Sequence, residues 1–143
     1  MKTFILIAGL SLGLSIANAQ KIKEADVPAP VKATFARQYP DIKSVKWEKE
    51  KGNYEAGFDL YKVETSLLMD EKGTILETES EIKVSELPKE VSDYITKTLP
   101  GKKIKEASRI VDPKGMITFE AEVDKLDYIF DSKGSFLNKK TEN

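Results

Sequence analysis

The chain contains neither cysteine nor histidine among its 143 residues. Without cysteine there can be no disulfides, no thiolate nucleophiles and no metal sites that need sulfur. Without histidine the commonest general base and the commonest transition-metal ligand are missing. Neither sign of charge dominates, because 23 Lys+Arg stand against 24 Asp+Glu, whereas a nucleic-acid-binding protein normally carries a basic excess. Composition therefore argues against an enzyme and against nucleic acid as a partner.

A long apolar run is also missing, except for a short one at the N-terminus. Residues 4–16 are almost wholly apolar or small, but about 13 residues are too few to span a bilayer, which takes about 20. Lys2 supplies a positive end, and Ala17-Asn18-Ala19 has the A-x-A pattern of a cleavage site. We predict a signal peptide over residues 1–19, cleaved after Ala19. The mature protein is then periplasmic or secreted and has no membrane span.

The rest of the chain contains a tandem repeat, in which apolar residues, prolines and glycines recur in the same order. The matching segments are Val27–Pro40 and Leu87–Pro100, Tyr54–Asp59 and Phe119–Asp124, and Met69–Leu76 and Phe130–Leu137. The offset drifts only between 60 and 65 residues (27 to 87, 54 to 119), so the differences lie in the connections. We predict one repeat over residues 25–80 and a second over 84–138, together forming one compact domain.

Each repeat opens with the pattern of an amphipathic helix. Large apolar residues recur at every fourth position, and a proline suits the first helical turn. These stripes are Val27, Val31, Phe35 and Tyr39 in the first repeat and Leu87, Val91, Ile95 and Leu99 in the second. Pro40 and Pro100 then disfavour continuation of the helix.

After each helix the apolar period changes from four to two, which indicates strands with one buried face. Four Lys-Gly pairs interrupt these strands, and in three of them an aspartate stands two residues before the lysine, as in Asp70-Glu71-Lys72-Gly73. An aspartate cap and a glycine able to take positive φ are typical of a short hairpin loop with a bulge. The sequence therefore predicts an α+β fold of two α-β-β-β-β repeats. Both helices should pack on the sheet face that bears Tyr54, Phe58, Phe119 and Val123.

This combination of helix stripe, alternating strands and D-x-K-G hairpins resembles the PepSY-like family, also called β-lactamase-inhibitor-like. The resemblance covers roughly residues 25–138 and implies a periplasmic protein with two helices on one face of an antiparallel sheet. Its motifs are structural, and no inhibitory loop can be matched residue by residue, so no functional residue is transferred.

Catalytic motifs are absent from the sequence. No serine lies in a G-x-S-x-G context, and there is no glycine-rich phosphate loop. Calcium is a possible ligand because oxygen donors are abundant, but the turn at Asp70 lacks the spacing of a calcium loop and contains a lysine. We therefore predict no catalytic residue, no cofactor and no metal site.

The candidate binding residues lie on the strand face that the helices leave open. This acidic patch consists of Glu55, Asp59, Glu120, Glu122 and Asp124. We expect a non-catalytic module that binds or inhibits an exported or envelope protein through this face. Changing Glu120 and Glu122 together to lysine should slow association and leave the melting temperature nearly unchanged. The alternative for the acidic patch is an ordinary solvated surface, and the alternative function is a periplasmic protein that binds a small ligand or a cation such as calcium.

Two aromatic residues and three glutamates complete these expectations. Trp47 shares a face with Val45 and belongs either to the core or, together with an exposed Tyr61, to an interface, where aromatic residues contribute much of the binding energy. Glu77, Glu79 and Glu81 alternate along one strand, which predicts a strand at a sheet edge exposed to water.

Overall fold

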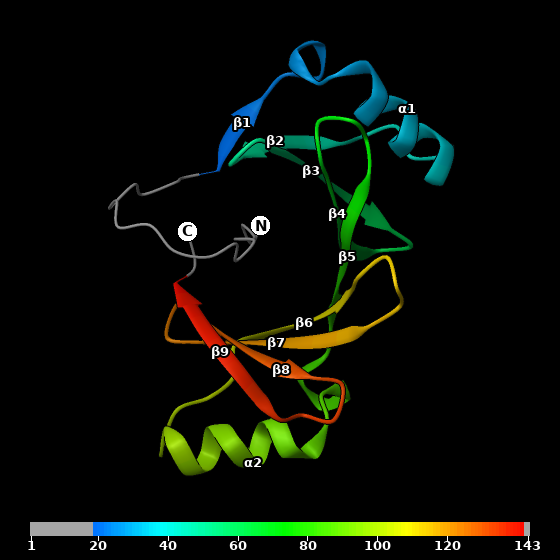
Figure 1. The fold of residues 1–143 in the computed structure, drawn as a ribbon. Helices are drawn as coiled ribbons and strands as arrows, with labels where there is room; N and C mark the ends of the chain where they lie inside the picture. The colour runs from blue at the N-terminus through cyan, green and yellow to red at the C-terminus, as the bar shows by residue number, and fades with distance from the viewer. Residues whose placement is uncertain (1–18, 142–143) are drawn as a thin grey trace.

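The structure, a computed structural model, describes residues 19–141 (Figure 1). The predicted signal peptide therefore lies outside the described residues except for Ala19. In chain order the elements are β1 (Gln20–Ile22), η1 (Glu24–Asp26), α1 (Ala29–Gln38), β2 (Lys46–Glu50), β3 (Asn53–Leu60), β4 (Val63–Met69), β5 (Ile75–Ile82), η2 (Val84–Glu86), α2 (Lys89–Thr98), β6 (Glu106–Val111), β7 (Ile117–Val123), β8 (Leu126–Asp131) and β9 (Phe136–Thr141).

The nine strands form a single antiparallel sheet in which every strand pairs with its neighbours in sequence. Each repeat supplies one helix followed by four strands, and β1 is added at the first edge. The pairing of β5 with β6, from Thr78↔Val111 to Ile82↔Ala107, joins the two repeats into one sheet. The predicted α+β fold with two tandem repeats is confirmed.

One strand lies elsewhere than predicted. β5, which carries Glu77, Glu79 and Glu81, is the central strand of the sheet and pairs with β4 and β6. The prediction of an exposed edge is wrong because the second repeat extends the sheet from the strand that ends the first repeat. Glu79 is consequently buried.

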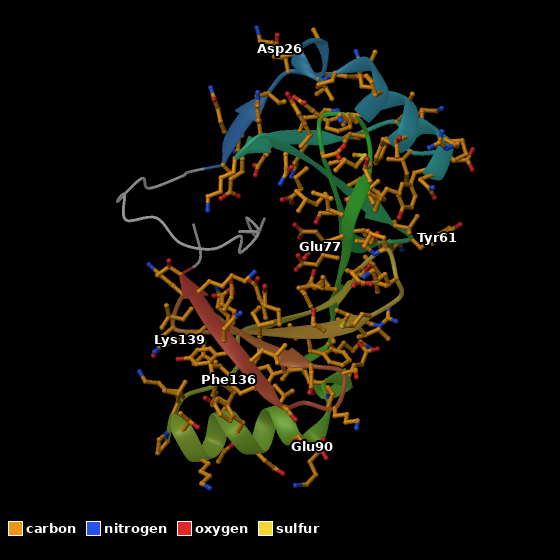
Figure 2. The ribbon with its side chains drawn as sticks, viewed as in Figure 1. Asp26, Tyr61, Glu77, Glu90, Phe136 and Lys139 are labelled. Carbon is orange, nitrogen blue, oxygen red and sulfur yellow. The ribbon has the colours of Figure 1, made fainter. Side chains whose placement is uncertain are left out.

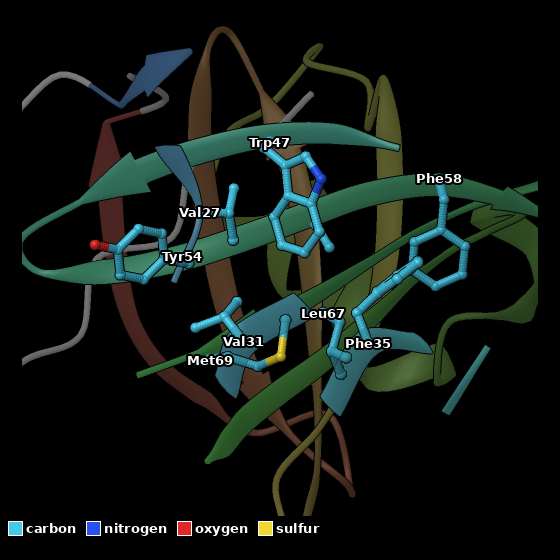
Figure 3. Packing of buried hydrophobic residues seen from close by; sticks show 9 residues of the cluster. Val27, Val31, Phe35, Trp47, Tyr54, Phe58, Leu67 and Met69 are labelled. Atoms are coloured by element: carbon cyan, nitrogen blue, oxygen red, sulfur yellow. The ribbon is translucent and has the colours of Figure 1, made fainter. Parts of the chain in front are cut away.

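Both helices pack on the same face of the sheet, and each covers the strands of its own repeat. The core under α1 contains Val31, Phe35, Trp47, Tyr54 and Phe58, which Figure 3 shows packed together. The ring of Phe35 lies 5.6 Å from that of Trp47 and 5.1 Å from that of Phe58, both edge to face. The core under α2 is built in the same way around Val91, Ile95, Val123 and Phe130, with Phe119 packed against it. The predicted helix-covered face is therefore correct. Pro28 and Pro88 stand at the N-cap, one residue before each helix.

The D-x-K-G turns have the predicted geometry. Oδ1 of Asp70 accepts hydrogen bonds from the backbone N–H groups of Lys72 and Thr74, both at 2.9 Å, and Asp112 and Asp131 do the same in their own turns. The strand register shifts just before the Asp70 and Asp131 turns, as expected for a bulge. These aspartates are turn caps, which accounts for their positions without a metal.

The sheet curls strongly, so that α1 and α2 lie on its outer side at opposite ends of the molecule (Figure 1). The opposite face of the same strands turns inward, and no described helix covers it. We call this face the inner face.

Candidate binding surface on the inner face

The strand registers define which side chains share the inner face. Because directly paired residues point to the same side of an antiparallel sheet, two rows can be followed across the strands of each repeat. In the first repeat these rows are Glu48, Glu55, Leu68 and Glu77, and Lys46, Gly57, Ser66 and Glu79. In the second repeat they are Ser108, Glu120, Ile129 and Asn138, and Glu106, Glu122, Asp127 and Lys140.

The structure brings Glu55, Asp59, Glu120 and Glu122 onto this face, but the expectation that they form an exposed patch is wrong for three of them. Glu55, Glu120 and Glu122 are only 5%, 1% and 0% exposed, while Asp59 is exposed. Asp124 does not join them, because β7 ends at Val123 and Asp124 lies in the following turn, where it pairs with Lys102 at 2.8 Å.

The physical reason for this burial is the curvature of the sheet, which turns the inner faces of the two repeats toward each other. Lys140 on β9 lies 3.6 Å from Glu120 on β7, and its charge also acts on Glu50 of β2 and Glu77 of β5. Figure 2 shows Glu77 pointing from β5 into the space that the curled sheet encloses. A sequence pattern can assign a side chain to a face but cannot show that the face closes on itself.

Burial raises the pKa of three carboxyl groups on the inner face. It raises the pKa of Glu55 to about 8, with further raising by the charges of Glu48 and Glu50 and some lowering by a hydrogen bond to Ser66. Burial also raises the pKa of Glu77, although the positive charge of Lys140 opposes it. The pKa of Glu50 is raised for the same reason, and Lys51 and Lys140 oppose the shift. The inner face thus holds carboxyl groups that ionise only at a cost in free energy.

Three buried glutamates on the inner face have carboxyl oxygens without a hydrogen-bond partner among the described residues. These oxygens are Oε1 and Oε2 of Glu50, Oε1 of Glu55 and Oε2 of Glu122. The other oxygen of Glu122 is 3.4 Å from Nζ of Lys105. A buried acceptor left unpaired typically costs about 1–3 kcal/mol, so the inner face has unused capacity for donors.

The inner face also contains a pocket of about 240 Å³ near the junction of the repeats. It is lined by residues of β2 to β6 and of the segment before β2, namely Ser44, Lys46, Gly57, Phe58, Asp59, Glu64, Thr65, Ser66, Glu79, Glu81, Glu106 and Ser108. Five of these residues are acidic and one is basic, so the pocket is a strongly negative cavity.

The two aromatic candidates, Trp47 and Tyr61, differ in exposure: the first is buried and the second is exposed. Trp47 is 5% exposed and packs against Phe35, so it belongs to the core and is not available to a partner. Tyr61 is 93% exposed at the tip of the β3–β4 hairpin, where its φ is +52° (Figure 2). A bulky residue with positive φ is uncommon, so this tyrosine is displayed at some cost in backbone strain.

Sequence reasoning missed several inner-face residues. Glu48 and Glu50 alternate with Trp47 and Lys49, so this alternation could have assigned both acids to the open face. Nothing in the local sequence indicates that Ser66, Glu106 and Ser108 meet around one pocket, because they come from strands of both repeats.

Two features are absent from the part of the chain that the structure describes. Within residues 19–141 no three acidic side chains are placed to hold a metal ion together. In the same range no helix has the length and apolar character needed to cross a membrane.

Comparison with solved structures finds the same fold in proteins of Bacteroides. A protein from Bacteroides eggerthii, described as periplasmic, matches with a TM-score of 0.70 and 16% identity over 80% of this chain and 88% of that one. A DUF2874 family protein from Bacteroides uniformis matches with a TM-score of 0.69 and 19% identity over the same shares. A BLIP-like protein from Bacteroides fragilis matches with a TM-score of 0.60 and 21% identity over 80% of this chain and 86% of that one. At these identities the likeness shows the fold alone.

The comparison with curated proteins gave no match. The family model described as "Putative beta-lactamase-inhibitor-like, PepSY-like" matches twice, over residues 15–77 and 70–138. The two matches cover most of the chain and correspond to its two structural repeats. The chain therefore belongs to the PepSY-like, β-lactamase-inhibitor-like family.

Proposed function

We propose that this protein is an exported, non-catalytic binding module that binds a periplasmic or envelope protein through the inner face of its sheet. The observation that carries the proposal is the set of buried carboxylate oxygens on this face that lack a donor, on Glu50, Glu55 and Glu122. A partner that brings hydrogen-bond donors or positive charge would remove part of the cost of burying them.

Three further points support the proposal. The described helices leave the inner face uncovered, and Tyr61, an exposed aromatic residue of the kind enriched at binding hot spots, lies at a hairpin tip next to pocket-lining residues. The chain lacks the histidine and cysteine side chains on which most hydrolytic and thiol chemistry depends. Solved relatives of the same fold are described as periplasmic and BLIP-like, in agreement with export by the predicted signal peptide.

The test uses the mature chain, residues 20–143, as bait for the envelope fraction of the source cell. Two double variants reverse the same amount of charge in different places. Asp59→Lys with Glu81→Lys alters exposed carboxylates that line the pocket on the inner face, and Glu24→Lys with Glu71→Lys alters exposed carboxylates elsewhere.

We expect a protein that is captured by the wild type and by the Glu24/Glu71 variant but not by the Asp59/Glu81 variant. With the purified partner, the dissociation constant should rise as the salt concentration increases from about 0.05 to 0.5 M, because the electrostatic screening length then falls to a few Å. A partner that binds all three baits equally, with no dependence on salt, would show that the inner face is not the binding surface.

A further inference from the structure

We infer that the pocket at the repeat junction is a receptor for one cationic side chain, an arginine or lysine of the bound partner. This inference rests on the proposed function and assigns the chemistry of recognition within it.

The lining of the pocket is strongly acidic. Asp59, Glu64, Glu79, Glu81 and Glu106 line the pocket, and Lys46 is the basic residue among the lining side chains. Such an excess of carboxylates in one concave site attracts cations and disfavours anions, because field lines are focused within a cleft. Three serine hydroxyls, of Ser44, Ser66 and Ser108, add acceptors that can share the N–H groups of a guanidinium or ammonium ion.

A buried acceptor lies at the border of the pocket. Glu55 lies two residues before Gly57 on the same face of β3 and makes a side-chain hydrogen bond with Ser66, which lines the pocket. Its side chain is 95% buried (5% exposed), yet its Oε1 has no hydrogen-bond partner among the described residues. A cation entering beside Ser66 would supply the hydrogen-bond donor that Oε1 of Glu55 lacks.

The two repeats differ at the place in the sheet where the first repeat has the pocket. The row Lys46, Gly57, Ser66 and Glu79 of the first repeat corresponds to the row Glu106, Glu122, Asp127 and Lys140 of the second. Where the second repeat has the fully buried side chains of Glu122 and Asp127, the first has glycine and serine. Space that the second repeat fills with its own side chains is therefore left open in the first.

The β3–β4 hairpin is also longer than its counterpart. Phe58 and Thr65 are paired, as are the corresponding Val123 and Leu126, but the first pair encloses residues 59–64 and the second only residues 124–125. Asp59 and Glu64, which pair with each other at the base of this longer hairpin, both line the pocket. The first repeat thus has both the opening and a longer hairpin whose base contributes two carboxylates to the pocket.

The size of the pocket favours a side chain over a larger ligand. A volume of about 240 Å³ lies below the roughly 300–1,000 Å³ of sites for drug-sized molecules. One long basic side chain fits that space, with the rest of the partner lying across the inner face.

The test titrates the mature chain with N-acetyl-arginine amide and N-acetyl-lysine amide, with N-acetyl-citrulline amide as the neutral analogue of the arginine probe. Binding is followed by NMR at the backbone amides of Gly57, Ser66 and Ser108. We expect millimolar binding of the cationic probes and at least tenfold weaker binding of citrulline. The double change Asp59→Asn with Glu81→Gln should weaken the affinity for the arginine probe at least fivefold. The control, Glu24→Gln with Glu71→Gln, should leave that affinity unchanged.

A second variant tests the geometry of the pocket. Gly57→Gln gives the first repeat a side chain shaped like Glu122 and should abolish probe binding by filling the space. If this variant fails to fold, the comparison of the Asp59/Glu81 and Glu24/Glu71 variants still tests whether the probe binds in the pocket. Equal affinity for the arginine and citrulline probes would overturn the inference. So would NMR chemical-shift changes confined to residues outside the pocket.

The outcome also separates this inference from the proposed function. A partner captured on the inner face by a protein that shows no preference for cationic probes would leave the function standing and remove the pocket assignment. Probe binding without any protein partner would keep the pocket and point instead to a small cationic ligand.

Discussion

At the scale of single residues, the most informative group is a carboxyl group that the fold buries without a complete set of partners. Glu55 has a pKa of about 8 in the folded protein against 4.5 for an ordinary glutamate, chiefly because of burial. The folded state therefore holds a proton that the unfolded state releases between about pH 4.5 and 8. Stability should be greatest below that window and should decline as the pH rises through it.

We predict that Glu55→Gln removes part of this decline. A shift of this size corresponds to several kcal/mol, on the order of 3–5, since each unit is about 1.4 kcal/mol. The variant should unfold like the wild type at pH 5 and be more stable at pH 8.5, as measured by urea denaturation. Glu24→Gln, at an exposed position, is the control and should follow the wild type at both pH values. A pH dependence unchanged by Glu55→Gln would mean that this group does not hold the proton.

A second residue-scale prediction replaces the expectation drawn from the sequence for Glu120 and Glu122. Both side chains are buried, Glu120 lies 3.6 Å from Lys140, and Glu122 lies 3.4 Å from Lys105. Changing both to lysine would bury two new cations beside existing ones. We now expect a loss of about 3 kcal/mol or more, or failure to fold, instead of an unchanged melting temperature. A thermal melt within a degree or two of the wild type would show that this region opens to solvent readily.

At the scale of elements, the D-x-K-G hairpins contact the helices as well as turning the chain. A Cβ atom on Gly73 would lie 2.5 Å from the carbonyl oxygen of Pro30, and one on Gly134 would lie 2.8 Å from Cβ of Glu90. Each of these glycines also has a positive φ, near +79° or +85°. The turns are therefore packed closely against the N-terminal ends of α1 and α2, which fixes each helix to the sheet of its own repeat.

The third prediction uses Gly115 as a matched control. Gly115 lies in the remaining D-x-K-G turn, the one that begins at Asp112, and has a similar φ of +81°. A Cβ atom there would meet nothing within 4 Å. Gly115→Ala should cost about 1 kcal/mol through backbone strain alone, whereas Gly73→Ala and Gly134→Ala should cost clearly more. Thermal melts of the three variants make the comparison. Equal losses at all three sites would show that the close contact with the helices contributes nothing.

At the scale of the whole molecule, the continuous sheet couples the two repeats. β5 pairs with β6, and Leu68 of the first repeat shares a small buried cluster with Ile110 of the second. Lys140, on the last strand, interacts electrostatically with Glu50 and Glu77 in the first repeat. The two repeats are predicted to form one compact domain, and these contacts lead us to expect that they unfold together.

The fourth prediction tests this coupling with Trp47, the single tryptophan, which reports on the core of the first repeat. Val91→Ala removes buried volume under α2 in the other repeat and should cost about 2 kcal/mol. The unfolding midpoint should fall equally by Trp47 fluorescence and by far-ultraviolet circular dichroism, as two-state behaviour requires. A fluorescence midpoint unchanged by this substitution would mean that the repeats unfold independently.

Much of this fold could be predicted from the sequence, because its signals are local. The four-residue stripe from Val27 to Tyr39, the alternation around Tyr54 and Phe58, and the Asp-x-Lys-Gly turns each depend on neighbours within a few positions. Hydrogen bonding and side-chain direction at that range follow from backbone geometry, so the helices, strands, hairpins and the helix-covered face could all be inferred. The repetition of these signals then indicated two similar units.

What the tertiary structure alone decided is how the two units combine. The pairing of β5 with β6 made an apparent edge strand central, and the curvature of the nine-stranded sheet turned an expected solvated face into an enclosed one. Burial of Glu55, the approach of Lys140 to Glu120 and the pocket between Asp59 and Glu106 all depend on residues far apart in the sequence. Alternation along a strand assigns a side chain to a face of the sheet, but twist and closure accumulate over all the strands, and only their sum determines whether that face meets water.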